Sequence, residues 1–347
     1  MRKRGIQIVL FALLTMGLVY AALGCGITNV SENSEVLNAK GEEPLTNIDD
    51  SLIVVGVSQV GSESVWRTAN TLSIQQTFTT ENGYFLILDN ARQKQENQIK
   101  AIRGFISQQV DYIVFSPITE DGWDTVLQEA KDAGIPVILF DRKLKVADES
   151  LYTTWVGSDF ELEGEKAGQF LEKELEGRDE TEPVNIVVLQ GTSGATAVIG
   201  RTKGFETIAK KHDNWHILEQ TDAEYTTTKG KEVMKRMLSR YKQIDVVVAQ
   251  NDDMMFGAVD AIKEAGFTTG AKGKIKVISF DACKAALEMV KSGIINVDIE
   301  CNPLQGPYIE EIIQKLEQNQ EVARETYIEE QVFDYKHMDE NIAERTY

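Results

Sequence analysis

The sequence predicts an α/β protein built from two doubly wound lobes, each with a parallel β-sheet covered by helices. Two observations support this fold class. A strand–helix–strand unit occurs twice, and its second strand ends in Val-Ile-Leu-Phe-Asp at 137–141 and in Val-Ile-Ser-Phe-Asp at 277–281. Short β-branched apolar runs also alternate with longer helical patterns along the chain. Such an alternation is typical of parallel sheets with helices on both faces.

The first lobe begins near residue 52. Gly134 and Pro136 end its third helix and open the next strand, as a helix-end glycine and a following proline are expected to do. The predicted strands are 52–58, 84–88, 112–115, 136–140 and 153–156, and the predicted helices are 64–81, 95–108 and 121–133.

The second lobe repeats the pattern after a polar stretch, residues 176–183, that we expect to be a surface loop. Its predicted strands are 185–190, 216–219, 246–250 and 275–280, and its predicted helices are 195–211, 228–240 and 253–265. A last cycle consists of helix 284–292, strand 295–300, helix 305–318 and one final strand, 325–332.

The N-terminus has the pattern of a targeting segment. Residues 1–24 read as a signal peptide, with three basic residues at 2–4 followed by an uncharged apolar stretch. Cys25 follows Gly24 as the lipid-modified cysteine of a bacterial lipoprotein would, although Ala22 stands where leucine is usual. Residues 25–50 would then be the lipidated cysteine and a flexible tether. An uncleaved anchor and a plainly secreted protein are the alternatives. All three place the folded part outside the cytoplasm.

The composition argues against nucleic acid as a partner. The formal charge of the 347 residues is −19, and removing Arg2, Lys3 and Arg4 with the signal peptide takes it from −19 to −22. Nucleic-acid binding needs a basic patch, and the chain has no run rich in lysine or arginine. The histidines have no neighbours at metal-ligand spacing, so neither a metal nor a cofactor is expected. Cys283 and Cys301 are predicted to be buried free thiols, with a disulfide as the alternative.

Polar residues of both charges follow the predicted strands of both lobes. Asp141 and Arg142 end one strand and Asp281 ends its counterpart, while Asn251 is expected to face a cleft with Asp252 capping the next helix. Ligands of open α/β sheets bind beyond the carboxyl ends of the strands. Directed hydrogen bonds combined with an aromatic face suit a sugar, so a polyol site is predicted.

Catalysis is not predicted. There is no nucleophile elbow, and no histidine is placed to serve a serine or cysteine. Asp141 and Asp281 could form a glycosidase pair. Arg142 follows Asp141 directly, however, and would favour its ionised form over the protonated form that a general acid requires.

Several motifs together resemble a known family. These are residues 55–64, Trp66-Arg67, 93–101, 140–142, 189–192 and 250–254. They resemble the ribose/galactose-type periplasmic sugar-binding proteins of ABC transporters, and among these most of all the galactofuranose-binding members. The resemblance covers roughly residues 52–320.

The resemblance implies the type I periplasmic binding protein fold, with two Rossmann-like lobes joined by a three-crossover hinge. The N-lobe would be 51–157 plus 301–328, and the C-lobe 158–300 plus 329–347. Val65 stands where the galactofuranose binders have glycine, and Ala282-Cys283 replaces a usual glycine. The implied sugar-binding residues are Glu63, Ser64, Val65, Trp66, Arg67, Asp141, Arg142, Arg201, Asn251 and Asp281.

The resemblance implies an extracytoplasmic lipoprotein that binds a monosaccharide, such as galactofuranose, for an ABC permease and its ATPase subunits. Its membrane contact would be the lipid on Cys25. A sensor subunit for a membrane histidine kinase or chemoreceptor is the alternative, and a glycoside-acting enzyme is a third hypothesis. A lac-type repressor is rejected, because a signal segment occupies the place of its helix-turn-helix.

Overall fold

The structure is a computed structural model that describes residues 51–62, 64–337, 342 and 345–347. The described residues form one compact unit. The predicted signal peptide, Cys25, the tether and Glu63 lie outside the described residues. Within the described part of the chain, no helix is long and apolar enough to cross a membrane.

The first sheet is parallel throughout, with strand order β11-β5-β4-β3-β1-β2. Its strands are β1 (Ile53–Gln59), β2 (Tyr84–Asn90), β3 (Tyr112–Phe115), β4 (Val137–Phe140), β5 (Thr154–Gly157) and β11 (Glu325–Tyr327). Strands β3, β4 and β5 are buried along their whole length, which explains their unbroken apolar sequences.

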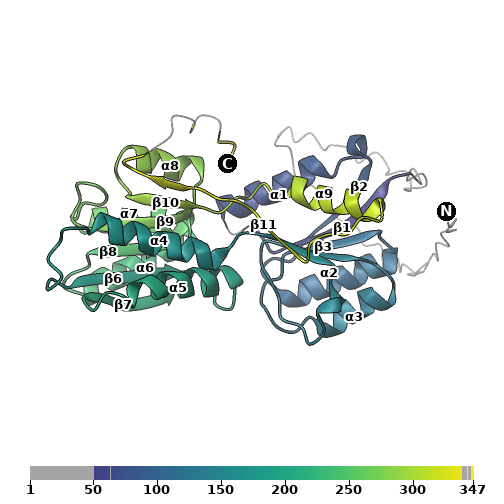
Figure 1. Ribbon diagram of the computed structural model, residues 1–347, viewed down its shortest axis with the longest axis horizontal. Helices are drawn as coiled ribbons and strands as arrows, with labels where there is room; N and C mark the ends of the chain where they lie inside the picture. The colour runs from purple at the N-terminus through teal and green to yellow at the C-terminus, as the bar shows by residue number, and fades with distance from the viewer. Residues whose placement is uncertain (1–50, 63, 338–341, 343–344) are drawn as a thin grey trace, which may run out of the picture. The chain divides into compact units, whose positions relative to one another are not determined.

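Helices cover both faces of the first sheet (Figure 1). The helices are α1 (Val65–Thr77), α2 (Gln95–Gln108), α3 (Asp124–Asp132) and α9 (Gly306–Glu317), with short 3₁₀ helices at Thr80–Asn82 and Glu149–Leu151. Ile102 and Phe105 of α2 pack with Leu127 of α3 in one core. Ile74 of α1 packs with Ile309 of α9 in the core on the other face. We call this sheet and its helices the first lobe.

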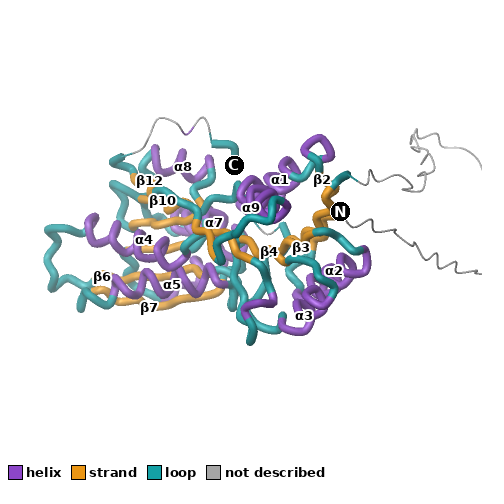
Figure 2. The backbone as a smooth tube through the Cα atoms, turned by 45° about the vertical axis from the view of Figure 1, so that its right-hand side comes forward, coloured by secondary structure: helices purple, strands orange, loops and turns teal. Residues whose placement is uncertain are grey.

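The second sheet has the corresponding order, β12-β10-β9-β8-β6-β7, and only β12 is antiparallel to its neighbour. Its strands are β6 (Val184–Gln190), β7 (Trp215–Asp222), β8 (Val246–Ala249), β9 (Lys276–Asp281), β10 (Val297–Glu300) and β12 (Val332–Asp334). The equal strand orders confirm that the repeated sequence unit builds two similar lobes, and both sheets are orange in Figure 2.

The second sheet and its helices form the second lobe. The helices are α4 (Phe160–Glu174), α5 (Thr196–Ala209), α6 (Thr227–Arg240), α7 (Asp252–Glu264) and α8 (Lys284–Lys291). Helices α4 and α5 run side by side over one face (Figure 1) and share a core that includes Leu171 and Phe205. Met234 of α6, Met255 of α7 and Val290 of α8 pack in the core of the other face.

Helix α4 was not predicted from the sequence. Its buried face includes Gly164, Ala167 and Gly168, which contribute little to an apolar helical pattern. The small residues are there because α5 lies very close. A Cβ on Gly164 would lie 2.3 Å from the carbonyl oxygen of Arg201 on α5. The close approach places Glu163 of α4 within reach of Arg201.

The predicted strand 325–332 is wrong, because the structure divides this segment between the two sheets. β11 pairs with β5 in the first sheet, and β12 pairs with β10 in the second. Residues 328–331 therefore cross between the lobes. Residues 158–159, between β5 and α4, and residues 301–305, between β10 and α9, are the other two crossovers. The three-crossover fold class expected from the sequence is confirmed.

Candidate functional site

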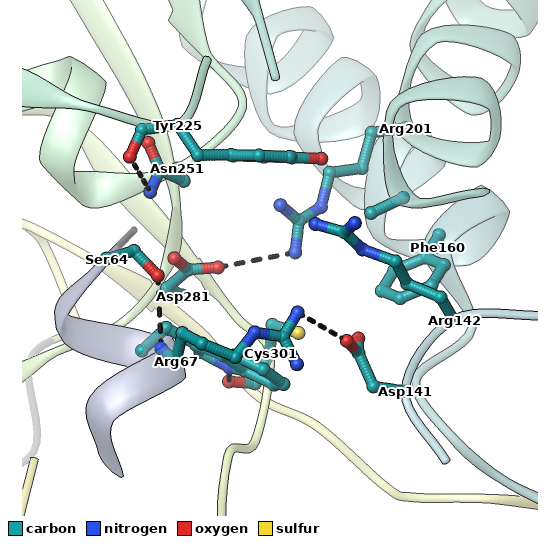
Figure 3. A pocket seen from close by; sticks show the side chains of 12 residues that line it. Ser64, Arg67, Asp141, Arg142, Phe160, Arg201, Tyr225, Asn251, Asp281 and Cys301 are labelled. Atoms are coloured by element: carbon teal, nitrogen blue, oxygen red, sulfur yellow. Dashed lines mark hydrogen bonds and ion pairs between the residues drawn. The ribbon is translucent and has the colours of Figure 1, made fainter. Parts of the chain in front are cut away.

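Side chains from both lobes line one small cavity (Figure 3). Its lining combines carboxylates, guanidinium groups, an amide and aromatic rings: Ser64, Trp66, Arg67, Asp141, Arg142, Phe160, Ala197, Arg201, Tyr225, Asn251, Asp281 and Cys301. The cavity measures about 30 Å³, which is room for roughly two water molecules. A monosaccharide is larger than this, so the lining must move apart before one can enter.

Asp141 is the anionic centre of the first lobe's side of the cavity. It follows β4, where the left-handed backbone (φ 58°) turns the chain away from the sheet. Its Oδ2 accepts a hydrogen bond from Nη2 of Arg67 at 2.6 Å and another from the Ser116 hydroxyl at 2.9 Å. The sequence suggested Arg142 as the partner of Asp141, but the ion pair that the structure shows is with Arg67.

Arg201 is the corresponding cationic centre of the second lobe. Its Nε donates to Oε2 of Glu163 at 2.6 Å, and its Nη2 lies 3.4 Å from Oδ1 of Asp281. Its Nη1 donates to the carbonyl oxygen of Gln250. All three charged side chains are buried, with at most 5% of any residue exposed. Burial raises the pKa of Asp281, and the charge of Arg201 opposes that rise.

The backbone around Asp281 is strained and is held by two further carboxyl groups. Asp281 (φ 107°) and Ala282 (φ 58°) both have positive φ, which is uncommon for residues other than glycine. Asp298 accepts from the N–H of Ala282 at 3.1 Å, and Asp252 accepts from the N–H of Cys283 at 2.8 Å. Burial raises the pKa of Asp252 to about 6. These bonds fix the loop that contains Ala282 and Cys283.

Helix N-termini supply two of the polar lining residues. Ser64 caps α1, with its hydroxyl accepting from the N–H of Arg67 at 3.0 Å. Asn251 caps α7, with its Oδ1 accepting from the N–H of Met254 at 2.9 Å. The prediction that Asp252 caps α7 is therefore wrong. Asp252 instead bonds the Ser279 hydroxyl at 2.6 Å in addition to Cys283.

Aromatic groups supply the apolar part of the lining. Trp66, Phe160, Ala197 and Cys301 form one buried cluster with members from both lobes. The indole N–H of Trp66 donates to the carbonyl oxygen of Cys301 at 2.6 Å. Flat apolar faces beside charged groups are the combination that a sugar ring requires.

Tyr225 belongs to the loop between β7 and α6 and lies across the cavity from Arg67 in Figure 3. The guanidinium of Arg142 lies 5.7 Å from the centre of its ring. Burial raises the pKa of Tyr225 above its usual range. Among the described residues, its buried hydroxyl has no hydrogen-bond partner. A buried hydroxyl without a partner is costly, so a ligand hydroxyl is a natural partner for it.

The structure brings together eight of the ten site residues implied by the family resemblance: Ser64, Trp66, Arg67, Asp141, Arg142, Arg201, Asn251 and Asp281. The side chain of Val65 is not part of the described lining, and the residue is 44% exposed. Its backbone N–H instead donates to Oδ2 of Asp253, on α7 of the other lobe, at 3.0 Å. Glu63 lies outside the described residues.

Sequence reasoning missed four lining residues, Phe160, Ala197, Tyr225 and Cys301. Tyr225 follows β7, so a search for aromatic residues beyond strand ends could have found it. Phe160 lies at the start of the unpredicted helix α4, and no local signal marks Ala197. Cys283 and Cys301 are both buried free thiols, as predicted. Within the described residues, one group of metal-ligand type has its atoms within 4.8 Å of one another: Glu163, Cys301 and Glu330.

The described architecture and the sequence agree with one family model. The model for the periplasmic binding protein domain matches residues 55–305, more than half of the chain. This chain belongs to the periplasmic binding protein family. Its relatives are solute-binding proteins rather than enzymes. Membership implies an extracytoplasmic or periplasmic location.

Similar proteins cover most of this periplasmic binding protein. The galactofuranose-binding protein YtfQ of Escherichia coli K12 is 43% identical over 74% of this chain and 79% of its own length. A Mycobacterium smegmatis protein solved with β-D-fucofuranose is 43% identical, with a TM-score of 0.78 over 82% of this chain and 92% of its own. The binding component of the arabinose ABC transporter of Shewanella sp. ANA-3, solved with L-arabinofuranose, is 40% identical, with a TM-score of 0.76 over 84% and 93%.

Proposed function

We propose that this periplasmic binding protein is the sugar-binding subunit of an ABC importer and binds a monosaccharide in its furanose form between the lobes. The observation that carries the proposal is the cavity in which Asp141 and Arg67 of one lobe meet Arg201, Asn251 and Asp281 of the other. The names of three similar proteins point to galactofuranose, fucofuranose and arabinofuranose. These ligands share a five-membered ring.

The proposed mechanism is closure around the sugar. In the ligand-free protein the lobes separate about the three crossovers, which gives the sugar the room that the small cavity lacks. The sugar hydroxyls then bridge charged groups of both lobes, and the ring lies against the aromatic lining. Because these contacts exist together only in the closed form, the sugar stabilises that form by its differential affinity. The permease would recognise the closed pair of lobes.

Replacing Asp141 with asparagine tests this proposal. Asparagine keeps the size of the side chain and tolerates a left-handed backbone, but it removes the charge that faces the sugar and Arg67. Loss of a charged hydrogen bond costs about 1.5–3 kcal/mol, so we expect the sugar affinity to fall about tenfold to over a hundredfold. Titration calorimetry with D-galactose, D-fucose and L-arabinose measures it, since each equilibrates with furanose forms in water.

Asp260→Asn is the matched control, because Asp260 lies exposed on α7 and pairs with Lys231 away from the cavity. Its sugar affinity should equal that of the unchanged protein. Equal affinities for Asp141→Asn and the unchanged protein would contradict the assignment of the cavity. Turnover of aryl galactofuranosides would contradict the binding function itself.

We further propose that Cys25 carries the lipid anchor and that residues 26–50 tether the folded unit to the membrane. The support is the order of basic, apolar and small residues before Cys25. Cys25→Ser should move the protein from the membrane fraction to the soluble fraction of bacterial cells and abolish the incorporation of labelled palmitate. Unchanged membrane association would contradict the anchor.

The sensor alternative shares the sugar site and differs only in the partner. Crosslinking of the sugar-loaded protein in membranes distinguishes the two. Capture of a permease would support the role in transport. Capture of a histidine kinase would instead support the role as a sensor subunit.

A further inference from the structure

A single carboxyl group joins all three crossovers. Glu330 belongs to the third crossover, and its Oε1 accepts from the hydroxyl of Ser158 in the first at 2.5 Å. The same oxygen accepts from the N–H of Asn302 in the second at 2.7 Å. The carbonyl oxygen of Glu330 accepts from Nζ of Lys166 on α4 at 2.8 Å. Any rotation between the lobes must therefore disturb the surroundings of Glu330.

The second carboxyl of this region, Glu163, connects the crossovers to the cavity. Its Oε2 holds Nε of Arg201 at 2.6 Å. Its Oε1 is buried and, among the described residues, has no hydrogen-bond partner. One carboxylate oxygen of Glu163, one of Glu330 and Sγ of Cys301 all lie within 4.8 Å of one another. A carboxylate oxygen buried in this way requires a donor, and a protonated carboxyl group on Glu330 is suitably placed to be one.

We propose that Glu163 and Glu330 share one proton, and that this protonated pair positions Arg201 toward the sugar cavity from the hinge. The inference rests on the proposed sugar-binding function and makes Glu163 and Glu330 positioning residues. The proton resides on Glu330 and is donated to Glu163. Glu163 keeps its charge for Arg201, and Arg201 in turn reaches Asp281.

A proton fits this site better than a metal ion does. Arg201 already supplies a positive charge in contact with Glu163, and a cation would lie next to that charge. Oε1 of Glu330 is occupied by two donors, which a metal would displace. A proton satisfies the remaining oxygen of Glu163 without breaking any of these contacts.

The charges around the pair favour the retention of that proton at neutral pH. Burial, together with the charge of Glu163, raises the pKa of Glu330 to about 9. Burial also raises the pKa of the Cys301 thiol far above its usual value, so the thiol stays protonated over the same range. The facing cations are Arg201 on α5 and Lys166 on α4, and Asp281 lies on the far side of Arg201.

The direction of the pH dependence follows from this arrangement. Above about pH 9, Glu330 loses the proton and two adjacent carboxylates repel each other. Glu163 then no longer holds Arg201 in one orientation, and the sugar affinity falls. The ligand-free protein also changes. Because the folded-state pKa of Glu330 is raised, its contribution to stability is complete at low pH and is lost as the pH rises through about 9.

The test is calorimetry of the full-length chain with D-galactose at pH 7 and pH 10. We expect the affinity of the unchanged protein to fall about fivefold between these values, which is the loss at pH 10 when the pKa of Glu330 is about 9 in the free form and one unit higher in the sugar-bound form. Glu330→Gln, which keeps a hydrogen-bonding side chain that does not titrate, should have nearly equal affinities at both values. Glu329→Gln, the same change at the exposed neighbouring residue, should follow the unchanged protein.

The inference would be overturned if the affinity for D-galactose fell equally between pH 7 and pH 10 in the unchanged protein and in Glu330→Gln, or if it fell in neither. A pH dependence removed by Cys301→Ser but not by Glu330→Gln would assign the proton to the thiol instead. Stoichiometric binding of zinc chloride that Glu330→Gln abolishes would replace the proton with a metal.

Failure of D-galactose to bind at either pH would count against the proposed function. It would not test the proton shared by Glu163 and Glu330, which a second measurement addresses without any sugar. Thermal unfolding without ligand then decides. The unfolding temperature of the unchanged protein should decrease as the pH is raised from 5 to 9, and that of Glu330→Gln should decrease less. Equal decreases in the two proteins would refute the shared proton.

Discussion

Replacing Arg201 with methionine is expected to lower the free energy of unfolding by about 3–5 kcal/mol, the usual cost of leaving buried charges without their partner. Methionine fills the space between the rings of Phe160 and Phe280, over which the guanidinium now lies. The loss therefore reports the charge rather than a cavity. Glu163 and Asp281 would keep their burial and lose their shared cation.

Urea unfolding followed by circular dichroism measures this effect. Burial already raises the pKa values of both carboxyl groups, so they can take up protons when Arg201 is absent. The deficit should therefore shrink as the pH falls, because neutral carboxyls need no counter-charge. Arg236→Met is the control, since Arg236 pairs with Glu219 at the surface with half of its side chain exposed. It should change stability by less than about 1 kcal/mol. Equal losses for the two variants would contradict the role of Arg201.

Opposite effects are expected from the same substitution at two helical glycines. Gly204 of α5 faces α4, where a Cβ would lie 2.0 Å from the carbonyl oxygen of Glu161. Gly204→Ala should destabilise the protein by about 1–3 kcal/mol through overpacking. Gly104 of α2 has open space, with the nearest atom to its Cβ at 3.9 Å. Gly104→Ala should stabilise the protein by about 0.4–1 kcal/mol, because alanine restricts the unfolded chain and favours the helix.

Urea unfolding of both variants under the same conditions checks the difference in sign. Gly204→Ala should also weaken sugar binding, because separation of α4 from α5 moves Glu163 away from Arg201. Two stabilising alanines would show that the helices can separate at little cost. If both alanine substitutions destabilised the protein, open space around Gly104 would not be sufficient for a helical alanine to be stabilising there.

Local signals in the sequence were sufficient for most of the fold. The repeated unit predicted two similar lobes, and the two sheets have corresponding strand orders. Helix α2 has the predicted bounds, Gln95–Gln108, because an amphipathic pattern with Ile102 and Phe105 on its buried face defines it. Helix α4 was missed because its inner face is built from glycine and alanine, which pack closely without being strongly apolar.

The sequence predicted which residues lie at the strand ends that form the site, but it did not predict which side chains they contact. Asp141 and Asp281 lie where the repeat placed them, at the carboxyl ends of equivalent strands: Asp141 follows β4, and Asp281 is the last residue of β9. The partner of Asp141 is Arg67, 74 positions earlier, and only the folded chain brings them together. Asn251 rather than Asp252 caps α7, because Asp252 is engaged by Ser279 and Cys283 from neighbouring segments. Glu330 had no local signal, since its importance comes from the meeting of three crossovers.

The first lobe is completed by segments that follow most of the second lobe in the sequence. Ile309, Ile313 and Ile328 belong to the core on one face of its sheet, and β11 forms its edge. A ribosome must therefore synthesise β6 to β10 of the second lobe before this core can close. Domains generally fold as units in the order of their synthesis, but here the lobe that begins first must wait for residues that come after the other lobe. The nascent first lobe should consequently stay loosely folded until Ile328 has been made, which would keep it suitable for passage through a translocon.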